Sequence, residues 1–187
     1  MEKQPVANDL KKVLITKEQI EEAVDRIAGE ITRDFRDSEK QLMILCIMKG
    51  SLPFTADLLK RIPIPCILEF MRVSSYGSAT VSTGQVKIIC DLDEETLEDF
   101  DIVVVEDIID TGHTLSNLLV HLRERRAHTV KLCALLDKPS RRKADVRVDY
   151  CGYTIPDEFA VGYGLDYDEK YRNLPYIGVL KEEIYRK

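Results

Sequence analysis

The chain has 187 residues, a length that suits one domain, and 44% of them are hydrophobic, which is enough for a packed core and too many for a disordered chain. The formal net charge of −6 argues against a nucleic-acid partner, because such proteins usually present a basic surface. No apolar stretch approaches the roughly 20 residues of a membrane span, and residues 1–5 show no signal pattern, so we expect a cytoplasmic protein without a membrane partner.

The N-terminal half of the chain predicts strands and helices in alternation. A short edge strand at 11–15 precedes an amphipathic helix over 17–36, which Thr16 and Gln19 should begin as a capping box. The later elements of this half are a buried strand at 42–48, a helix marked by Phe54, Leu58, Leu59 and Ile62, strands at 66–73 and 85–92, and a small, polar loop at 74–80 that we expect to be mobile.

The C-terminal half continues this alternation. It predicts strands at 102–106 and 130–136, a helix between them with leucines at positions 115, 118, 119 and 122, and strands at 146–150, 159–163 and 176–180. The pattern indicates a single α/β domain over residues 1–187, with an open, mainly parallel, twisted sheet flanked by helices. Ligands bind beyond the carboxyl ends of such strands, where Lys49-Gly50, residues 106–114 and Asp137-Lys138 should meet.

Residues 102–114 are the most informative stretch of the chain. A hydrophobic strand ends in two adjacent carboxylates, Glu106 and Asp107, and a third, Asp110, precedes a hydroxyl-and-glycine turn at 111–114 that leads into a helix. Such a turn makes an anion cradle, because the first N–H groups of a helix have no partner inside it. The carboxylates would repel a plain anion unless they hold sugar hydroxyls or a divalent cation. The stretch therefore indicates a sugar phosphate that carries Mg²⁺.

Other nucleotide and metal motifs are excluded. The chain has no G-x-x-x-x-G-K-[ST] segment, and Gly162-Tyr163-Gly164 is followed by Tyr167 where a dinucleotide motif needs a third glycine. The three histidines and five cysteines fit no zinc spacing, and most cysteines occur in apolar runs, as expected of reduced core thiols. The acid-rich stretch at 91–101 is expected to be a solvated turn.

The stretch at 103–114 resembles the phosphoribosyl-pyrophosphate signature of the type I phosphoribosyltransferases. Its Asp110 points to the hypoxanthine(-guanine) branch, since the adenine and orotate enzymes usually carry Ala or Thr there. The resemblance extends over nearly the whole chain, and one departure is His113, where many relatives carry Lys. Further matching segments are the pyrophosphate loop at 48–51, the flexible closing loop at 74–77, the purine-binding segment at 155–167 and the stretch at 171–175.

This resemblance implies the family's fold and reaction. The fold would have a core at about 38–150 and a small hood built from the terminal segments 1–37 and 151–187. The reaction transfers ribose 5-phosphate from phosphoribosyl pyrophosphate to N9 of hypoxanthine and guanine, with Mg²⁺, and gives IMP or GMP and pyrophosphate. The resemblance also implies a homodimer or homotetramer, and a cis peptide at Lys49-Gly50.

The resemblance assigns roles at the ribose-phosphate end of the site. The main-chain N–H groups of residues 110–114, with the hydroxyls of Thr111 and Thr114, would hold the 5-phosphate. Glu106 and Asp107 would hold the ribose hydroxyls directly or through Mg²⁺, and Arg172 would bind pyrophosphate as a bidentate fork. The other residues implied to bind phosphoribosyl pyrophosphate are Lys49, Gly50, Ser74, Ser75, Tyr76, Ile108, Gly112 and His113.

At the purine end, the implied general base is Asp110, which would take the proton from N7. Lys138 would donate to the 6-oxo group, which would exclude adenine because its amino group leaves the lysine proton unpaired. Phe159 would stack on the base. Ala160, Leu165 and Asp166 would complete the purine site, with Asp166 also reaching a second Mg²⁺ directly or through water.

Plainer interpretations stay open for these residues. Asp110 could be a helix N-cap, Lys138 a solvated lysine in a basic run, and Phe159 a core residue. Arg172 could be a surface arginine, and the acid pair a solvated strand end. For the whole protein, the alternatives are an RNA-binding attenuation regulator of the same fold, a xanthine- or guanine-preferring enzyme, and an α/β ligand sensor.

Overall fold

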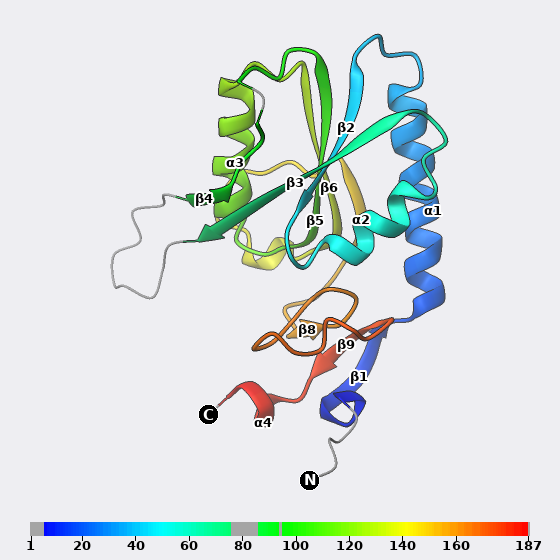
Figure 1. Cartoon of the computed structure of the whole chain (residues 1–187). Coiled ribbons are helices and arrows are strands. Elements are labelled where there is room, and N and C mark those ends of the chain that lie inside the picture. Colours follow the sequence, from blue (N-terminus) through cyan, green and yellow to red (C-terminus); the bar gives the residue numbers. More distant parts are fainter. Residues whose placement is uncertain (1–5, 76–85, 94, 187) are drawn as a thin grey trace.

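The larger of two sheets has the strand order β4-β3-β2-β5-β6-β7 (Figure 1). The computed structural model describes residues 6–75, 86–93 and 95–186. Within them β4 pairs with β3 antiparallel, and the other pairs in this sheet are parallel. The strands are β2 (Gln41–Ile47), β3 (Cys66–Ser75), β4 (Val86–Cys90), β5 (Phe100–Ile109), β6 (Thr129–Asp137) and β7 (Tyr150–Thr154).

Helices cover both faces of this sheet because successive strand residues point to opposite sides. Val103 and Val105 belong to a core with α1 (Lys17–Phe35) and α2 (Leu52–Leu59). Ile102 and Val104 belong to a second core with the leucines of α3 (His113–Glu124). In Figure 1, α1 and α3 accordingly flank the sheet on opposite sides. None of the helices described in residues 6–186 combines the length and apolar character of a membrane span.

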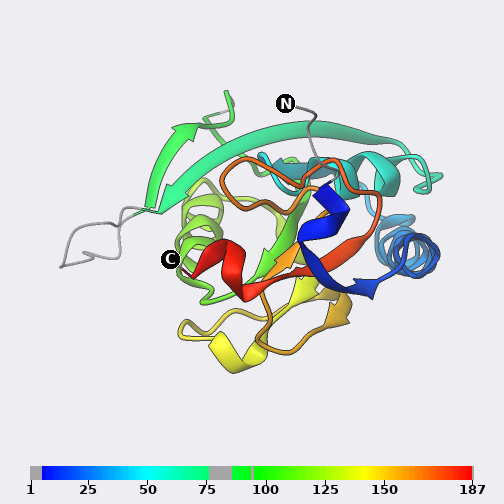
Figure 2. The same ribbon diagram turned by 90° about the horizontal axis from the view of Figure 1, so that it is seen from below.

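The smaller sheet is antiparallel and joins distant parts of the chain. Its order is β1-β9-β8, with β1 at Leu10–Ile15, β9 at Ile177–Leu180 and β8 at Ala160–Val161. Figure 2, seen from below, shows this sheet lying across the end of the larger one. The short elements are the 3-10 turns η1 (Val6–Asp9) and η2 (Pro139–Arg141) and the C-terminal helix α4 (Glu182–Tyr185). The junctions between the two sheets lie after Ile15 and after Thr154.

The predicted α/β class and mainly parallel sheet are confirmed, and one predicted strand is wrong. The capping box forms, with Gln19 N donating to Thr16 Oγ1 at 3.3 Å and Thr16 N donating to Gln19 Oε1 at 2.9 Å. No strand occupies 146–149, because Val146 packs into the α3 core and the Asp149 carboxylate accepts the N–H of Leu132 instead. The alternating polarity of 146–150 resembled a strand, but pairing with β6 begins at Tyr150.

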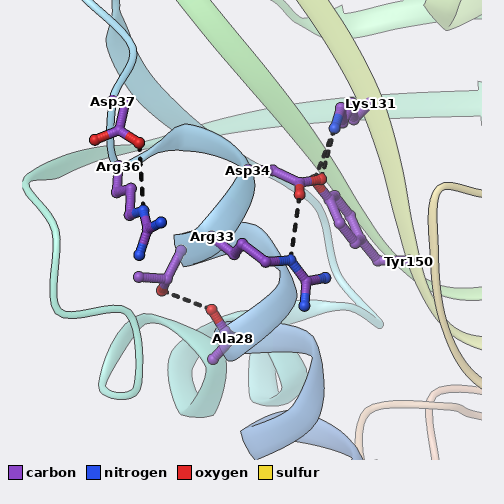
Figure 3. A network of polar contacts seen from close by, with 8 residues as sticks. Ala28, Arg33, Asp34, Arg36, Asp37, Lys131 and Tyr150 are labelled. Atoms are coloured by element: carbon purple, nitrogen blue, oxygen red, sulfur yellow. Dashed lines mark hydrogen bonds and ion pairs between the residues drawn. The ribbon is translucent and has the colours of Figure 1, made fainter.

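The end of α1 is tied to the sheet through Asp34 (Figure 3). Its Oδ2 atom accepts a hydrogen bond from Lys131 Nζ and another from the Tyr150 hydroxyl, each at 2.7 Å. Lys131 also lies over the ring of Tyr150, 5.4 Å from its centroid. These hydrogen bonds, first that from Lys131, lower the pKa of Asp34. The nearby Asp37 has a side chain that is 89% exposed, and the contact drawn for it in Figure 3 is with Arg36.

Replacing Asp34 by Ala should lower the free energy of unfolding by about 1–2 kcal/mol, because two charge-assisted hydrogen bonds at a partly exposed site are lost. Urea unfolding measures this, with Asp37→Ala as the matched control that should change little. The pKa of Asp34 is lower in the folded chain, so its contribution is present above the unfolded pKa and disappears as the pH falls through the folded one. Equal unfolding midpoints for the two variants would contradict the role of this network.

Candidate active site

A pocket of about 430 Å³ opens beyond the carboxyl ends of β5 and β6, where residues of the small sheet also reach it. It brings together much of the predicted site, although those residues come from four separate parts of the chain. The predicted residues that line it are Asp107, Ile108, Asp110, Lys138, Phe159, Ala160, Leu165 and Asp166. This agrees with the rule that open α/β sheets bind ligands at this edge.

The acid pair lies near the end of β5 and is half-buried rather than fully solvated. Burial, and then the charge of Asp107, raise the pKa of Glu106 well above its usual value, and Glu106 Oε2 has no hydrogen-bond partner. Burial also raises the pKa of Asp107 to about 6, although its Oδ1 accepts the N–H of Ile108 at 2.7 Å and Arg172 acts in the opposite direction. The interpretation as a solvated strand end is therefore wrong. A buried carboxylate oxygen without a partner has spare capacity for a cation or a hydroxyl.

The residues at this position fit Mg²⁺ held jointly with a substrate. Glu106 Oε2 offers an unpartnered buried oxygen, and the Asp107 and Asp166 carboxylates repel each other, as the raising effect of Asp166 on the pKa of Asp107 indicates. Within the described parts of the chain, no cluster of three or more carboxylate, histidine or cysteine side chains could hold a metal by itself. Mg²⁺ is typically bound by one or two carboxylates, waters and substrate phosphates, so such a cluster is not required.

Replacing Asp107 by Asn should stabilise the ligand-free protein and weaken its response to ligand. The amide removes a buried charge at nearly constant volume, so we expect the melting temperature to rise by about 2–4 °C, which corresponds to about 1 kcal/mol. The further rise that Mg²⁺ and phosphoribosyl pyrophosphate produce in the original protein should shrink. Differential scanning fluorimetry with an external dye measures both effects. Asp99→Asn, whose side chain is 80% exposed, is the control; an undiminished ligand response in Asp107→Asn would refute the role.

The turn after β5 has the geometry of an anion cradle. Gly112, at the N-cap of α3, has a φ of +81°, and a Cβ there would press on Arg142 at 3.0 Å. The Thr111 carbonyl accepts the N–H groups of Lys143 and Ala144 at 2.9 and 3.1 Å, which braces the turn. No side chain caps α3, so the interpretation of Asp110 as its N-cap is wrong. The first N–H groups of α3, from His113 and Thr114 onward, remain suited to a phosphate.

The Asp110 carboxylate lies in the pocket and is held by an arginine. Arg141 Nε donates to Asp110 Oδ1 at 2.7 Å, and Arg141 Nη1 lies 3.5 Å from Asp157 Oδ2. These two carboxylates raise the pKa of Arg141. Arg141 thus connects the predicted general base to the segment before Phe159.

Lys138 is buried at the end of β6 and is not part of a solvated basic run. Its residue is 8% exposed, and Nζ donates to the Glu158 carbonyl at 2.6 Å and lies 3.9 Å from Asp157 Oδ1. Burial is the largest cause of the lowering of its pKa. An ammonium held in this way has donors left for a carbonyl in the pocket.

Phe159 lies at the pocket between two other aromatic rings. Tyr185 stacks on it, with the ring centroids 4.6 Å apart and the planes at 25°. Tyr167 meets it edge-on, with centroids 5.6 Å apart. Phe159 also packs against the small core of Val161, Tyr171, Leu174 and Leu180, so it has contacts of a core residue as well as a position on the pocket wall.

At the predicted pyrophosphate end of the site, Lys49 and Arg172 both contact the carboxylate of Glu169. Lys49 Nζ lies 3.2 and 3.1 Å from the two oxygens of Glu169. Arg172 Nη2 lies 3.5 Å from Glu169 Oε2 and 2.9 Å from Asp166 Oδ1, and Nη1 donates to the Gly164 carbonyl at 2.7 Å. The Lys49 ammonium lowers the pKa of Glu169. Because the Nε atom of Arg172 is buried and its guanidinium is tied to the loop, it is not a freely solvated surface arginine.

The loop after β2 packs tightly against this end of the site. A Cβ at Gly50 would collide with the Asp107 carboxylate, and one at Gly164 would collide with the Gly50 carbonyl, so only glycine fits at both positions. The expected cis peptide lies one bond earlier, between Met48 and Lys49. Ser74 and Ser75 end β3, and Tyr76 and most of the expected closing loop lie outside the described residues.

Several residues at the site carried no recognisable signal in the sequence. Arg141, Asp157 and Glu158 lie within or beside segments already singled out, and their charges could have suggested a contact with Asp110 or Lys138. Tyr185, the last residue of α4, and Arg186, which follows it, also line the pocket, but they lie far along the chain from the motifs. Glu169 is one acid among many in the chain. Its pairing with Lys49 is visible only in three dimensions.

Comparison with known proteins agrees with the geometry. Residues 14–168 match the model of the phosphoribosyl transferase domain. The chain is 51% identical over 178 residues to the hypoxanthine-guanine phosphoribosyltransferase of Bacillus subtilis, covering 95% of this chain and 97% of that one. A crystal structure of a hypoxanthine phosphoribosyltransferase from Staphylococcus aureus matches all of both chains with a TM-score of 0.92 and 47% identity. One from Bacillus anthracis, a hypoxanthine-guanine phosphoribosyltransferase, matches 92% of this chain and 99% of that one with a TM-score of 0.85 and 44% identity. The chain therefore belongs to the phosphoribosyltransferase family, in the branch of the hypoxanthine-guanine phosphoribosyltransferases.

Proposed function

We propose that the protein is a purine salvage enzyme that transfers the 5-phosphoribosyl group of phosphoribosyl pyrophosphate to N9 of hypoxanthine and guanine. IMP or GMP and pyrophosphate would be the products. The observation that carries this proposal is one pocket that is lined by Asp107, Asp110 and the buried Lys138. A sugar-phosphate site and a carbonyl-recognising cation next to each other suit a nucleotide-forming reaction.

The ribosyl donor would be bound by the end of β5 and the start of α3. The N–H groups of the turn at 110–114 and the hydroxyls of Thr111 and Thr114 suit the 5-phosphate. Glu106 and Asp107 suit the ribose hydroxyls, and with Asp166 they are the residues that would hold Mg²⁺. When bound, Mg²⁺ would supply positive charge to the departing pyrophosphate.

The purine would lie between Lys138 and Asp110. Lys138 Nζ is suited to donate to the 6-oxo group, and the Asp110 carboxylate to take the proton from N7 as the bond at N9 forms. The hydrogen bond from Arg141 Nε to Asp110 Oδ1, at 2.7 Å, holds the Asp110 carboxyl group in one orientation. Phe159, Ala160 and Leu165 provide the apolar wall for the ring.

Departure of pyrophosphate would rely on the cations at the other end of the site. Lys49 and Arg172 both contact Glu169, so a diphosphate that binds there would exchange places with this carboxylate. Positive charge grows on the ribose ring as the leaving group departs, and the carboxyl groups of Glu106 and Asp107 would balance it.

The decisive experiment combines purified protein, Mg²⁺ and phosphoribosyl pyrophosphate with one free base at a time. We expect IMP from hypoxanthine and GMP from guanine, one pyrophosphate per nucleotide, no AMP from adenine, and no product in excess chelator. The rate with xanthine, compared with the rates with hypoxanthine and guanine, ranks the three 6-oxopurines as substrates. Nucleotide formation with adenine alone, or none with any base, would refute the proposal.

The same proposal includes a homodimer or homotetramer in the cytoplasm without a nucleic-acid partner. The net charge of −6 supports the absence of RNA binding. Light scattering measures the oligomeric state. Filter binding to RNA, with and without nucleotide, tests whether the chain acts as an attenuation regulator instead.

A further inference from the structure

The C-terminal helix α4 reaches the pocket although no motif of the sequence includes it. Tyr185 and Arg186 are among the residues that line the pocket, together with Asp110, Lys138 and Phe159. In Figures 1 and 2, α4 directly follows β9, the central strand of the small sheet. It therefore extends from the sheet that covers the carboxyl ends of the larger one.

The start of α4 is held close to Phe159 by backbone hydrogen bonds. Leu180 N donates to the Phe159 carbonyl at 2.9 Å, and Lys181 N donates to the Asp9 carbonyl at 3.0 Å. The Lys181 side chain donates to the Asn8 carbonyl at 2.7 Å. A four-residue helix is not stable alone, so its position depends on these anchors and on packing.

The packing contact of α4 with the pocket is the ring of Tyr185. It stacks on Phe159 with centroids 4.6 Å apart and an angle of 25° between the planes, while Tyr167 meets Phe159 edge-on. Tyr185 is half-buried, and it lies on the pocket wall as well as against Phe159. Because the two rings are stacked, a flat ligand in the pocket can stack on one of them and meet the other only at its edge.

We propose that Tyr185 is a purine-binding residue, and that its ring together with Phe159 forms the aromatic wall against which the base binds. This inference rests on the proposed function, and it deepens that function by assigning part of the base affinity to the C-terminal segment. A purine is flat and offers π-faces, so it can stack on one ring of this pair while the edge of the other ring adds to its contact area. The phosphoribosyl pyrophosphate end of the site does not include Tyr185, so its affinity should not depend on this ring.

A single tryptophan tests the position of the base without any measurement of turnover. The chain contains no tryptophan, so Tyr185→Trp introduces one emission centre. Saturating IMP, and then hypoxanthine with pyrophosphate, should change its fluorescence in a saturable manner. The control Phe100→Trp lies at the first residue of β5, at the opposite end of that strand from the pocket, and should not respond. A Tyr185→Trp variant that forms nucleotide but shows no fluorescence response overturns the inference and leaves the proposed function intact.

Steady-state kinetics provide the second test. Tyr185→Ala should raise KM for hypoxanthine about 3- to 10-fold and leave KM for phosphoribosyl pyrophosphate within about twofold, while Tyr185→Phe should resemble the original protein. Glu183→Ala, on the same helix, is the matched control. An unchanged or lowered KM for the base in Tyr185→Ala overturns the inference, because the ring would then be neutral or obstruct the pocket. If the original protein forms no nucleotide, the proposed function itself is refuted.

Discussion

Replacing Asp110 by Ala is expected to lower kcat by about 10²- to 10⁴-fold, the usual contribution of a general base. The KM for phosphoribosyl pyrophosphate should change little, because the phosphate cradle consists mainly of main-chain N–H groups and the N-cap of α3 is Gly112. Steady-state kinetics with hypoxanthine separate the two constants. The loss should appear in kcat and in kcat/KM to a similar extent.

Asp110→Asn is the sharper companion variant, because it keeps the size of the side chain and removes its charge. It should lose nearly as much activity as Asp110→Ala if proton transfer is the role of the carboxylate. The variant also breaks the ion pair with Arg141, which in the original protein joins Arg141 Nε to Asp110 Oδ1 at 2.7 Å. Turnover near that of the original protein in Asp110→Asn would end the general-base assignment.

Replacing Lys138 by Gln is expected to lower kcat/KM for hypoxanthine and guanine by about 10- to 100-fold, the range of a hydrogen bond from a charged donor. Rejection of adenine should weaken, because the amide can also accept a hydrogen bond. The buried Glu158 carbonyl loses its 2.6 Å ammonium partner, so the stability of the variant should be measured as well. The readout is kcat/KM for all three bases.

Lys143→Gln is the matched control for Lys138→Gln. Lys143 follows Lys138 by five residues, and its side chain is exposed. The control should leave the base preference unchanged. If Lys138→Gln also leaves the ratio of hypoxanthine to adenine unchanged, Lys138 does not recognise the 6-oxo group.

The parts of the site that could be predicted from the sequence are those formed by residues that are close together in the chain. The acid pair lies within β5, and Asp110 and the turn at 111–114 follow that strand directly, so their proximity did not depend on the rest of the fold. Continuous hydrophobic runs likewise identified β5 and β6, because both faces of these strands are buried. The alternating polarity at 146–150 was misleading, because Val146 is buried against α3 without strand pairing.

The remaining features depend on contacts between distant residues of common types. Arg141 meets Asp110 across 31 positions of the chain, and Lys49 meets Glu169 across 120. Neither residue type nor spacing distinguishes these pairs from ordinary surface charges. The stacking of Tyr185 on Phe159 has the same character, since it arises only when β8 and β9 pair in the small sheet.

Glu169 is a counter-ion, within the protein itself, for both Lys49 and Arg172. It therefore affects which anions can bind to these two side chains. A small monovalent ion that meets one of the two cations gains little over the carboxylate already present. A diphosphate can contact both cations at once. Displacing Glu169 therefore costs less free energy for each negative charge of the ligand. In the proposed function, the arrangement would favour the ribosyl donor over monovalent salt ions, and Glu169 balances the charge of both cations until the donor binds.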